Sequence, residues 1–290
     1  MNGLLVLDKP SGITSHDVVA IVRRATCEKS IGHLGTLDPM ATGVLPLLLG
    51  KYTRLAQFFG QAEKHYTGHI HFGFATDSFD ADGTPTTVPQ PLKKSLQELQ
   101  TLSKKFHGEI DQLPPIFSAK KINGVSAHKL ARAGVEVPVK AARITIHNFD
   151  LTSLTNDTAT FTISVSAGGY VRSVAHELGQ LAGCGAHLSS LRRTRAGAFS
   201  LEQAITIEQL KSASVAELEA LLPHPRTLLP EMPSVTVDEQ LAGRLRNGMQ
   251  VNLPDFSTAP LIKVFTAPTE LLAIGRRIAG TLIQPIVVLG

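Results

Sequence analysis

The sequence predicts an α+β fold with a small β-rich module at its C-terminal end. Segments in which apolar and polar residues alternate, as is typical of strands, occur at widely separated places in the chain. Segments with helical spacing lie between them, but without the regular strand–helix order of a parallel α/β sheet. Four prolines between residues 223 and 233 then precede a tail rich in Val, Ile and Leu.

The N-terminal quarter of the chain predicts a strand, a helix, a loop and a second strand. Residues 3–8 form a short apolar run that a Lys-Pro pair ends, as expected for a buried strand. Ser15 is the expected N-cap of a helix whose apolar residues recur at i, i+3, i+4 and i+7. A glycine-rich loop spans residues 32–43. Residues 64–74 then alternate as in a strand with one buried face.

The middle of the chain continues this mixture. Helical spacing returns over residues 92–106, and residues 161–165 alternate again. Tyr170 opens a helix with one apolar stripe, and Gly183 suits the left-handed position that follows a helix C-terminus. These segments predict a helix, a strand and a second helix in that order.

Capping boxes indicate where helices resume before the prolines. Ser-x-x-Gln at 200–203 and Thr-x-x-Gln at 206–209 each predict a helix N-terminus, and helix is expected to about Leu222. The prolines that follow predict a linker. We therefore expect a first domain over residues 1–228 and a small β module over residues 233–290.

Composition excludes several classes of protein. Of the 290 residues, 43% are hydrophobic and 18% charged, which is too apolar for a disordered chain. The two cysteines, Cys27 and Cys184, lie far apart, which excludes a disulfide framework or CxxC metal site and fits a reducing cytoplasm. No apolar run approaches the ~18 residues of a membrane span, and no secretion signal is present. A net charge of +4 permits a nucleic-acid partner without requiring one.

The glycine-rich loop carries the most informative residue, Asp38. Three glycines within residues 32–43 allow backbone conformations that other residues resist. Pro39 restricts its own φ and favours an extended Asp38, so the loop is suited to hold one carboxylate in a set orientation. The loop lacks the Gly-Lys-Ser/Thr of a phosphate-binding loop. From these residues alone, Asp38 is either a functional carboxylate or the cap of a turn.

Seven segments together resemble one known family. The loop reads GHLGTLDPMATG, and it is accompanied by LDKPSG at 7–12, KHY at 64–66, DSFDADG at 77–83, QLPPIFSAKK at 112–121, GYVRS at 169–173 and LRRT at 191–194. Their order and spacing resemble those of TruB-type tRNA pseudouridine synthases over about residues 3–225. The tail from Pro233 onward is similar to the PUA-type RNA-binding module of bacterial members.

The resemblance implies an isomerase that converts uridine 55 in the T-loop of tRNA to pseudouridine. This reaction breaks the N1–C1′ bond, turns the freed uracil and joins C5 to C1′. The implied catalytic domain is α+β around a mixed or antiparallel sheet. One carboxylate can supply the covalent or charge-stabilising step, so no metal or cofactor is expected. The expected partner is the T-arm of tRNA, bound by a cytoplasmic monomer that needs no guide RNA.

The resemblance also implies roles for individual residues. Asp38 matches the catalytic aspartate, and Arg172 matches the arginine that pairs with it. Tyr66 matches the tyrosine that stacks on the target uracil and is positioned for proton transfer, although period alone would place it in the core. Arg172 taken alone would be a surface residue at the start of a helix. The expected substrate-binding residues are His33, Tyr170, Leu191, Lys121 and Lys9, the last also as a support for the catalytic loop.

Further basic residues are candidates for phosphate contacts, although a solvated basic face explains any single one better. They are Lys121, Arg132, Arg192, Arg193 and Arg195. Three residues depart from the family pattern and leave the fine substrate contacts open. They are Phe117, Lys120 and His128.

Metal binding and RNA binding without catalysis are the alternatives. His65, His69 and His71 share one strand face and are a candidate zinc site, but polar residues on the open side of a half-buried strand explain them better. The segment 80–83 resembles part of a calcium loop, but Pro89 stands where that loop needs a glutamate, so we reject calcium. A tRNA-binding or folding factor would differ from an enzyme in not depending on Asp38.

Overall fold

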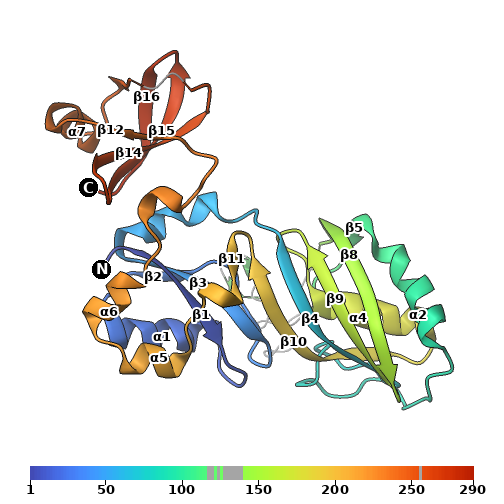
Figure 1. The fold of residues 1–290 in the computed structure, drawn as a ribbon. Helices are drawn as coiled ribbons and strands as arrows, with labels where there is room; N and C mark the ends of the chain where they lie inside the picture. The colour runs from blue at the N-terminus through green and yellow to red at the C-terminus, as the bar shows by residue number, and fades with distance from the viewer. Residues whose placement is uncertain (116–120, 123–124, 127–139, 255–256) are drawn as a thin grey trace.

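A large mixed sheet forms the centre of the N-terminal part of the chain (Figure 1). The computed structural model describes residues 1–115, 121–122, 125–126, 140–254 and 257–290. The path through the sheet runs β1 (Gly3–Lys9), β3 (Thr42–Leu49), β10 (Ala186–Ala196), β4 (Lys64–Phe72), β9 (Thr158–Val165), β8 (Ala142–Thr155) and β5 (Gly108–Gln112). Beside this path, β2 (Ile31–His33) pairs with β3 and β11 (Phe199–Ser200) with β10. The β3–β10 pair is parallel and the other pairs are antiparallel, so the predicted α+β class with a mixed sheet is confirmed.

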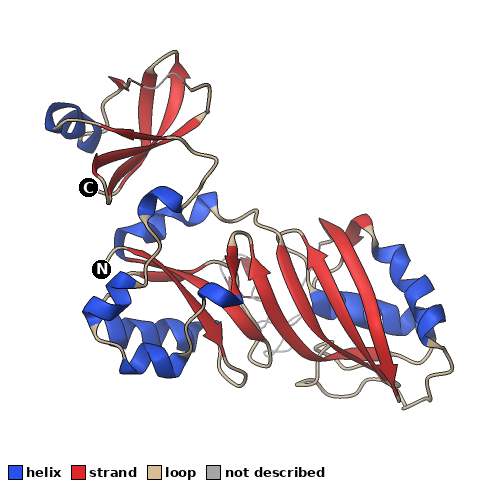
Figure 2. Cartoon of the chain, in the orientation of Figure 1, coloured by secondary structure: helices blue, strands red, loops and turns tan. Residues whose placement is uncertain are grey.

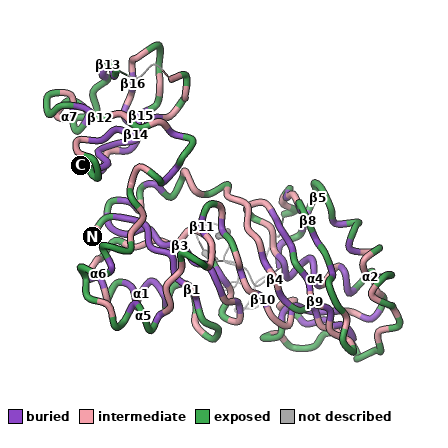
Figure 3. Tube along the Cα trace, viewed as in Figure 1, coloured by how far each residue is buried: buried purple, intermediate pink, exposed green. Residues whose placement is uncertain are grey.

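Helices cover this sheet in two groups (Figure 2). One group packs near β1 and consists of α1 (Ser15–Thr26), α5 (Ile207–Ser212) and α6 (Val215–Ala220). The other packs against β8 and β10 and consists of α2 (Leu96–Ser103) and α4 (Val171–Ala182). Short 3₁₀ helices are η1 (Gly50–Phe58), η2 (Lys104–Phe106), η3 (Leu201–Gln203) and η4 (Pro225–Thr227), and β6 (Lys121–Ile122) pairs with β7 (Val125–Ser126). Buried residues follow the central strands and the helix faces turned toward them (Figure 3), so both groups share one apolar core.

The helix termini agree with the capping signals except at α1. Thr14, not Ser15, is the N-cap, because its hydroxyl accepts from the Asp17 N–H and the Asp17 carboxylate accepts from Thr14. Gly183 adopts the expected left-handed conformation after α4. Both predicted capping boxes are confirmed, at η3 and at α5. A further box at Ser214 begins α6, so the last helical stretch is two short helices rather than one.

Two long strands have no clear signal in the sequence. In β8 and β10, buried and exposed positions do not alternate regularly, because bulges shift their register against β9 and β4. In β10 the pattern is further hidden by Arg193, a charged residue with no exposed surface. The strand predicted over residues 64–74 ends earlier, at Phe72, where Gly73 has a φ of 116°.

The C-terminal residues form a second sheet, as the tail composition predicts. Its strands, in spatial order, are β12 (Ser234–Thr236), β14 (Leu261–Ala267), β15 (Glu270–Ala279), β16 (Leu282–Val288) and β13 (Val251–Asn252). The helix α7 (Glu239–Arg246) was not predicted, because it buries only Ala242 and Leu245, too few apolar residues for a periodic signal. The two sheets lie on either side of the proline-rich stretch, and the boundaries at 228 and 233 stay predictions.

The second sheet packs on the first part of the chain through a shared apolar cluster. Phe265 and Ile274 belong to the same cluster of buried residues as Leu4 and Val44. The buried Lys263 ammonium donates to two carbonyl oxygens of the linker, one of them that of Leu228 at 2.6 Å. Among the described residues, no helix is long and apolar enough to cross a membrane.

Gly43 allows β1, β3 and β10 to meet beside the Asp38 loop, and its replacement tests this packing. Its φ is +104°, and a Cβ there would lie 2.2 Å from the Arg193 carbonyl oxygen. Gly12 has a φ of +86° with nothing within 4 Å of the same position. Gly12→Ala should therefore lower the free energy of unfolding by about 1 kcal/mol, through backbone strain alone. Gly43→Ala should lower it by about 3 kcal/mol or more, because the added Cβ also clashes. Urea unfolding measures both, and equal losses would contradict the close approach.

Candidate active site

The loop that carries Asp38 is built over the buried ammonium of Lys9, the last residue of β1. This ammonium donates to the carbonyl oxygens of Pro10 at 2.9 Å, Pro39 at 3.1 Å and Ala41 at 2.6 Å. Lys9 has 0% of its surface exposed, and burial lowers the pKa of its ammonium to about 8, against the opposing charge of Asp38. Lys9 was predicted both to bind substrate and to support the loop. Because Lys9 is buried, it can support the loop, but it cannot contact a substrate directly.

Ser15 holds the same loop from the first turn of α1. Its hydroxyl donates to the Leu37 carbonyl oxygen at 3.0 Å and accepts from the Leu37 N–H at 2.8 Å. This explains why Ser15 is not the helix N-cap: its side chain is buried against the loop. The residue directly before Asp38 is therefore tied to the helix by both of its backbone polar groups.

Arg193 braces the other side of the loop and corrects a prediction. Its guanidinium donates to the carbonyl oxygens of Val44 at 2.7 Å, Gly35 at 3.0 Å and Thr36 at 3.4 Å. The side chain is fully buried, so it cannot serve as the phosphate contact that its basic charge suggested. Buried cations at Lys9 and Arg193 thus satisfy backbone carbonyls that the irregular loop leaves without strand or helix partners.

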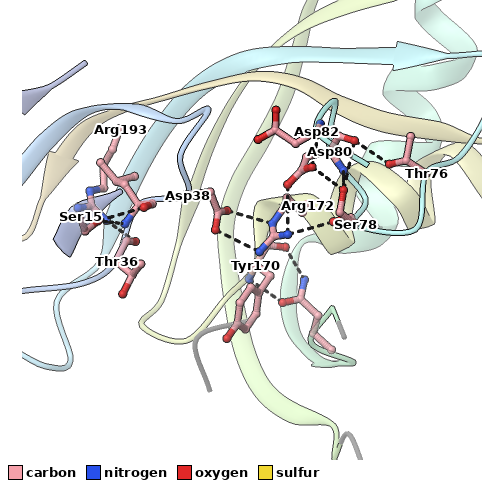
Figure 4. A network of polar contacts seen from close by, with 12 residues as sticks. Ser15, Thr36, Asp38, Thr76, Ser78, Asp80, Asp82, Tyr170, Arg172 and Arg193 are labelled. Atoms are coloured by element: carbon pink, nitrogen blue, oxygen red, sulfur yellow. Dashed lines mark hydrogen bonds and ion pairs between the residues drawn. The ribbon is translucent and has the colours of Figure 1, made fainter. Parts of the chain in front are cut away.

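Arg172 connects Asp38 to a second carboxylate, that of Asp80 (Figure 4). Its Nε and Nη2 lie 3.0 and 3.2 Å from the two oxygens of Asp38, and its Nη1 lies 3.2 Å from Asp80. The Arg172 and Asp80 side chains are each 6% exposed, but that of Asp38 is 34% exposed. Arg172 therefore holds Asp38 in a bidentate pair while leaving part of this carboxylate open to a ligand.

The Asp80 loop is attached to α4 at two points. Arg172 also donates from Nη1 to the Ser78 carbonyl oxygen at 3.0 Å. One turn further along α4, the His176 ring stacks on Phe79, with the ring centres 3.8 Å apart and an interplanar angle of 19°. Phe79 has a φ of 66°, an uncommon conformation for an aromatic residue. The stack and the ion pair together hold this loop in a conformation that presents Asp80 to Arg172.

A cavity of about 230 Å³ lies beside the Asp38–Arg172 pair, and most of the predicted site residues line it. They are Asp38, Tyr66, Tyr170, Arg172 and Leu191. Tyr66 comes from β4 and Leu191 from β10, and both side chains are almost fully buried. Gln112 fixes Tyr170 by accepting from its N–H at 2.8 Å and donating to its carbonyl oxygen at 3.1 Å. The fold thus brings together residues from four separate segments of the sequence.

Two groups in this cavity have raised pKa values. Burial raises the pKa of the Asp38 carboxyl, the charge of Arg172 opposes that rise, and the charge of Asp80 adds to it. Burial also raises the pKa of the Tyr66 hydroxyl, against the nearby charge of Arg193. Arg172 is therefore the group that favours ionised Asp38, whereas Tyr66 keeps its proton near neutral pH and is a donor rather than a base.

Other predicted residues lie outside this cavity wall. His33 ends β2 opposite Leu47, and burial lowers the pKa of its ring. The side chain of Lys121 and the residues Phe117, Lys120, His128 and Arg132 lie outside the described residues. Arg192 pairs with Asp8 at 2.7 Å, and Arg195 donates to the Gly197 carbonyl oxygen.

Asp80 and Ser15 are the supporting residues that sequence reasoning missed. The acidic segment around Asp80 was noticed as a motif, but the sequence offered no partner for it. Arg172 lies 92 positions away, and only the fold shows that one guanidinium serves two carboxylates. The role of Ser15 in holding the loop was missed, because a serine at the start of a helix usually indicates a cap.

The strand histidines have ordinary polar partners. His65 lies 3.4 Å from Glu63, His69 Nδ1 lies 2.6 Å from the Ser190 hydroxyl, and His71 bonds to Thr158. Within the described ranges, no group of three or more His, Cys, Asp or Glu residues is arranged to hold a metal ion.

Comparison with known proteins connects this geometry to one family. Residues 23–171 match a family model described as "TruB family pseudouridylate synthase (N terminal domain)", and residues 172–230 match "tRNA pseudouridylate synthase B C-terminal domain". The chain is 42% identical over 294 residues to tRNA pseudouridine synthase B of Solibacter usitatus, covering 100% of both chains. It is 41% identical over 250 residues to the protein of the same name from Geobacter sulfurreducens, covering 86% of this chain and 82% of that one.

Solved structures show the same fold. The chain is similar to one in the "Crystal Structure of a Cbf5-Nop10-Gar1 Complex", with a TM-score of 0.69 and 26% identity over 99% of this chain and 85% of that chain. The family matches and the shared fold together define the class of protein, a pseudouridine synthase. The chain belongs to the TruB family of pseudouridylate synthases, and it is therefore an isomerase.

The buried Lys9 ammonium should make stability depend on alkaline pH. Its pKa of about 8 in the folded protein is below the ordinary 10.5, so the folded state binds fewer protons than the unfolded chain between these values. The unfolding free energy of the wild type should therefore rise relative to Lys9→Met as the pH increases through this range, by up to about 3 kcal/mol.

Urea unfolding at several pH values measures this difference. Lys51→Met, at an exposed lysine of η1, is the matched control and should show no such slope. A difference between wild type and Lys9→Met that does not change with pH would contradict a buried ammonium beneath the loop.

Proposed function

We propose that this enzyme converts uridine 55 in the T-loop of tRNA to pseudouridine, with Asp38 as the catalytic carboxylate. The observation that carries the proposal is the partly open Asp38 carboxylate, held by Arg172 at the wall of a cavity that Tyr66 and Leu191 also line. The relatives named above as tRNA pseudouridine synthase B support tRNA as the substrate.

The reaction needs little more than a well-placed charge and a closed cavity. The N1–C1′ bond of the uridine breaks, the C5–C1′ bond forms, C5 loses its proton and N1 gains one. No electron acceptor or donor takes part, and nothing is transferred to a second molecule. An ionised carboxylate beside C1′ and the base can serve this exchange by attack or by proton removal. Arg172 favours that ionised state against the effect of burial.

The cavity walls suit an uracil that has left its stack. Reaching a base inside a folded RNA loop requires flipping it out, at a cost of a few kcal/mol. The ring of Tyr66 offers an aromatic face to the base, and Leu191 offers an apolar one. Because Tyr66 keeps its proton, its hydroxyl can donate to the turning base or to the freed nitrogen.

Partners follow from the same proposal. We expect the T-arm of a tRNA to bind without a guide RNA, although a solved structure of this fold is described as an "H/ACA RNP bound to a substrate RNA". That neighbour is 24% identical and shows the fold alone. A monomeric state and a cytoplasmic location stay predictions of the sequence.

Tritium release from tRNA tests the proposal. In an unmodified transcript labelled at C5 of its uridines, each turnover at one site should free one label. The wild type should release one equivalent per tRNA with EDTA present and no other RNA or protein, and a transcript with cytidine at position 55 should release none. Asp38→Asn should lower the rate about a thousandfold or more and keep tRNA binding, because it removes the charge and not the cavity.

Asp111→Asn is the matched control, at an exposed carboxylate of β5. It should release tritium at the wild-type rate. No release by the wild type on a tRNA that it binds would overturn the proposal and favour a tRNA-binding or folding factor. Tritium release from the transcript with cytidine at position 55 would instead show that the target is another uridine.

A further inference from the structure

Lys64, the first residue of β4, stands where two hollows of the surface meet. It lines the cavity that contains Asp38, and it also lines a neighbouring cavity of about 260 Å³. The second cavity is walled by aromatic and apolar residues of η1, the β10–β11 turn and the linker, including Phe58, Phe59 and Phe199. Among the lining residues, Lys64 is the one that both cavities share. A chain that passes from one cavity to the other therefore crosses this side chain.

The Asp38 loop passes directly over the Lys64 side chain. A Cβ added to Gly35 would lie 3.2 Å from Lys64 Cε and 3.8 Å from Lys64 Nζ. Gly35 also has a φ of +103°, so both its conformation and its lack of a side chain permit this approach. The ammonium is thus held against the rim of the catalytic loop.

Among the described residues no carboxylate forms an ion pair with Lys64, although Glu231 lines the same second cavity. Arg172 takes up both carboxylates, those of Asp38 and Asp80. Arg193 is satisfied by backbone carbonyls, whose dipoles do not cancel a full charge. No hydrogen bond or ion pair joins the Lys64 ammonium to the described residues, and both burial and the charge of Arg193 lower its pKa. A partly buried cation beside another cation is unfavourable in the free protein, and an anionic ligand would relieve this repulsion.

We propose that Lys64 binds a phosphate of the RNA backbone that flanks the target nucleotide. The inference rests on the proposed function, because it takes the base in the Asp38 cavity to be part of an RNA chain. A phosphodiester is the anion that such a ligand brings to the rim of this cavity. The phosphate pairs with the Lys64 ammonium, so part of the binding energy becomes available only when the nucleotide is seated.

Salt dependence of RNA binding tests the contact. Binding of a tRNA transcript is measured in the unreactive Asp38→Asn background, with and without Lys64→Met, over a range of salt concentrations. Lys64→Met should weaken binding about tenfold and reduce the slope of log K against log salt by about 0.7 to 1, the value of one phosphate contact. Lys64→Arg should keep the slope, and Lys211→Met, at an exposed lysine of α5, should change neither quantity.

Neutral linkages locate the phosphate. RNAs with a methylphosphonate at one or the other phosphate flanking the target uridine are bound to the same proteins. With Lys64 present, one of the two linkages should weaken binding about tenfold. With Lys64→Met, the same linkage should have no further effect, as expected of two partners in one contact. If each methylphosphonate weakens binding by the same factor with Lys64 and with Lys64→Met, the proposal is overturned.

Each proposal fails in its own way. If the wild type releases no tritium, the proposed reaction fails while the binding measurements still report on Lys64. If tritium is released but Lys64→Met keeps the parent affinity and slope, only the Lys64 contact is wrong. A Lys64→Met protein that unfolds at a lower temperature is replaced by Lys64→Gln, and wild-type binding by a folded Lys64→Gln would equally overturn the contact.

Discussion

The site depends on one guanidinium, that of Arg172, which is shared by two carboxylates. A carboxylate in a partly apolar cavity resists ionisation, and the proposed reaction needs Asp38 charged. Arg172 opposes the effect of burial directly, and its own orientation is set by Asp80 and the Ser78 carbonyl oxygen. The acidic loop therefore acts on Asp38 through Arg172, and α4 is the rigid element that carries the pair.

The irregular Asp38 loop is stabilised by cations that point at its backbone. Lys9 and Arg193 together donate to five carbonyl oxygens between Gly35 and Val44, and Lys9 also donates to that of Pro10. Neither cation reaches the surface. A loop without strand partners can be held in one conformation in this way. The arrangement also leaves positive charge at the site, which suits a polyanionic substrate.

The sequence predicted the class of fold and most of the cavity, but not how the residues are held. Asp38, Tyr66 and Arg172 lie in motifs that resemble those of a known family, and this resemblance, rather than the residues alone, assigned their roles. The burial of Arg193 could not be predicted, because an arginine in a basic segment normally suggests solvent or phosphate. The strand β10 was missed for the same reason, since its core positions include that charge. Asp80 needed the fold, because its partner belongs to a distant helix.

The most direct test of this account is the pKa of the Asp38 carboxyl with and without Arg172. Carbon-13 NMR of aspartate-labelled protein can follow this carboxyl through a pH titration, with the Asp38→Asn spectrum identifying its signal. If Arg172 keeps Asp38 ionised, the pKa should rise clearly in Arg172→Met relative to the wild type. An Asp38 pKa that stays the same in a folded Arg172→Met protein would contradict the central role given to this ion pair.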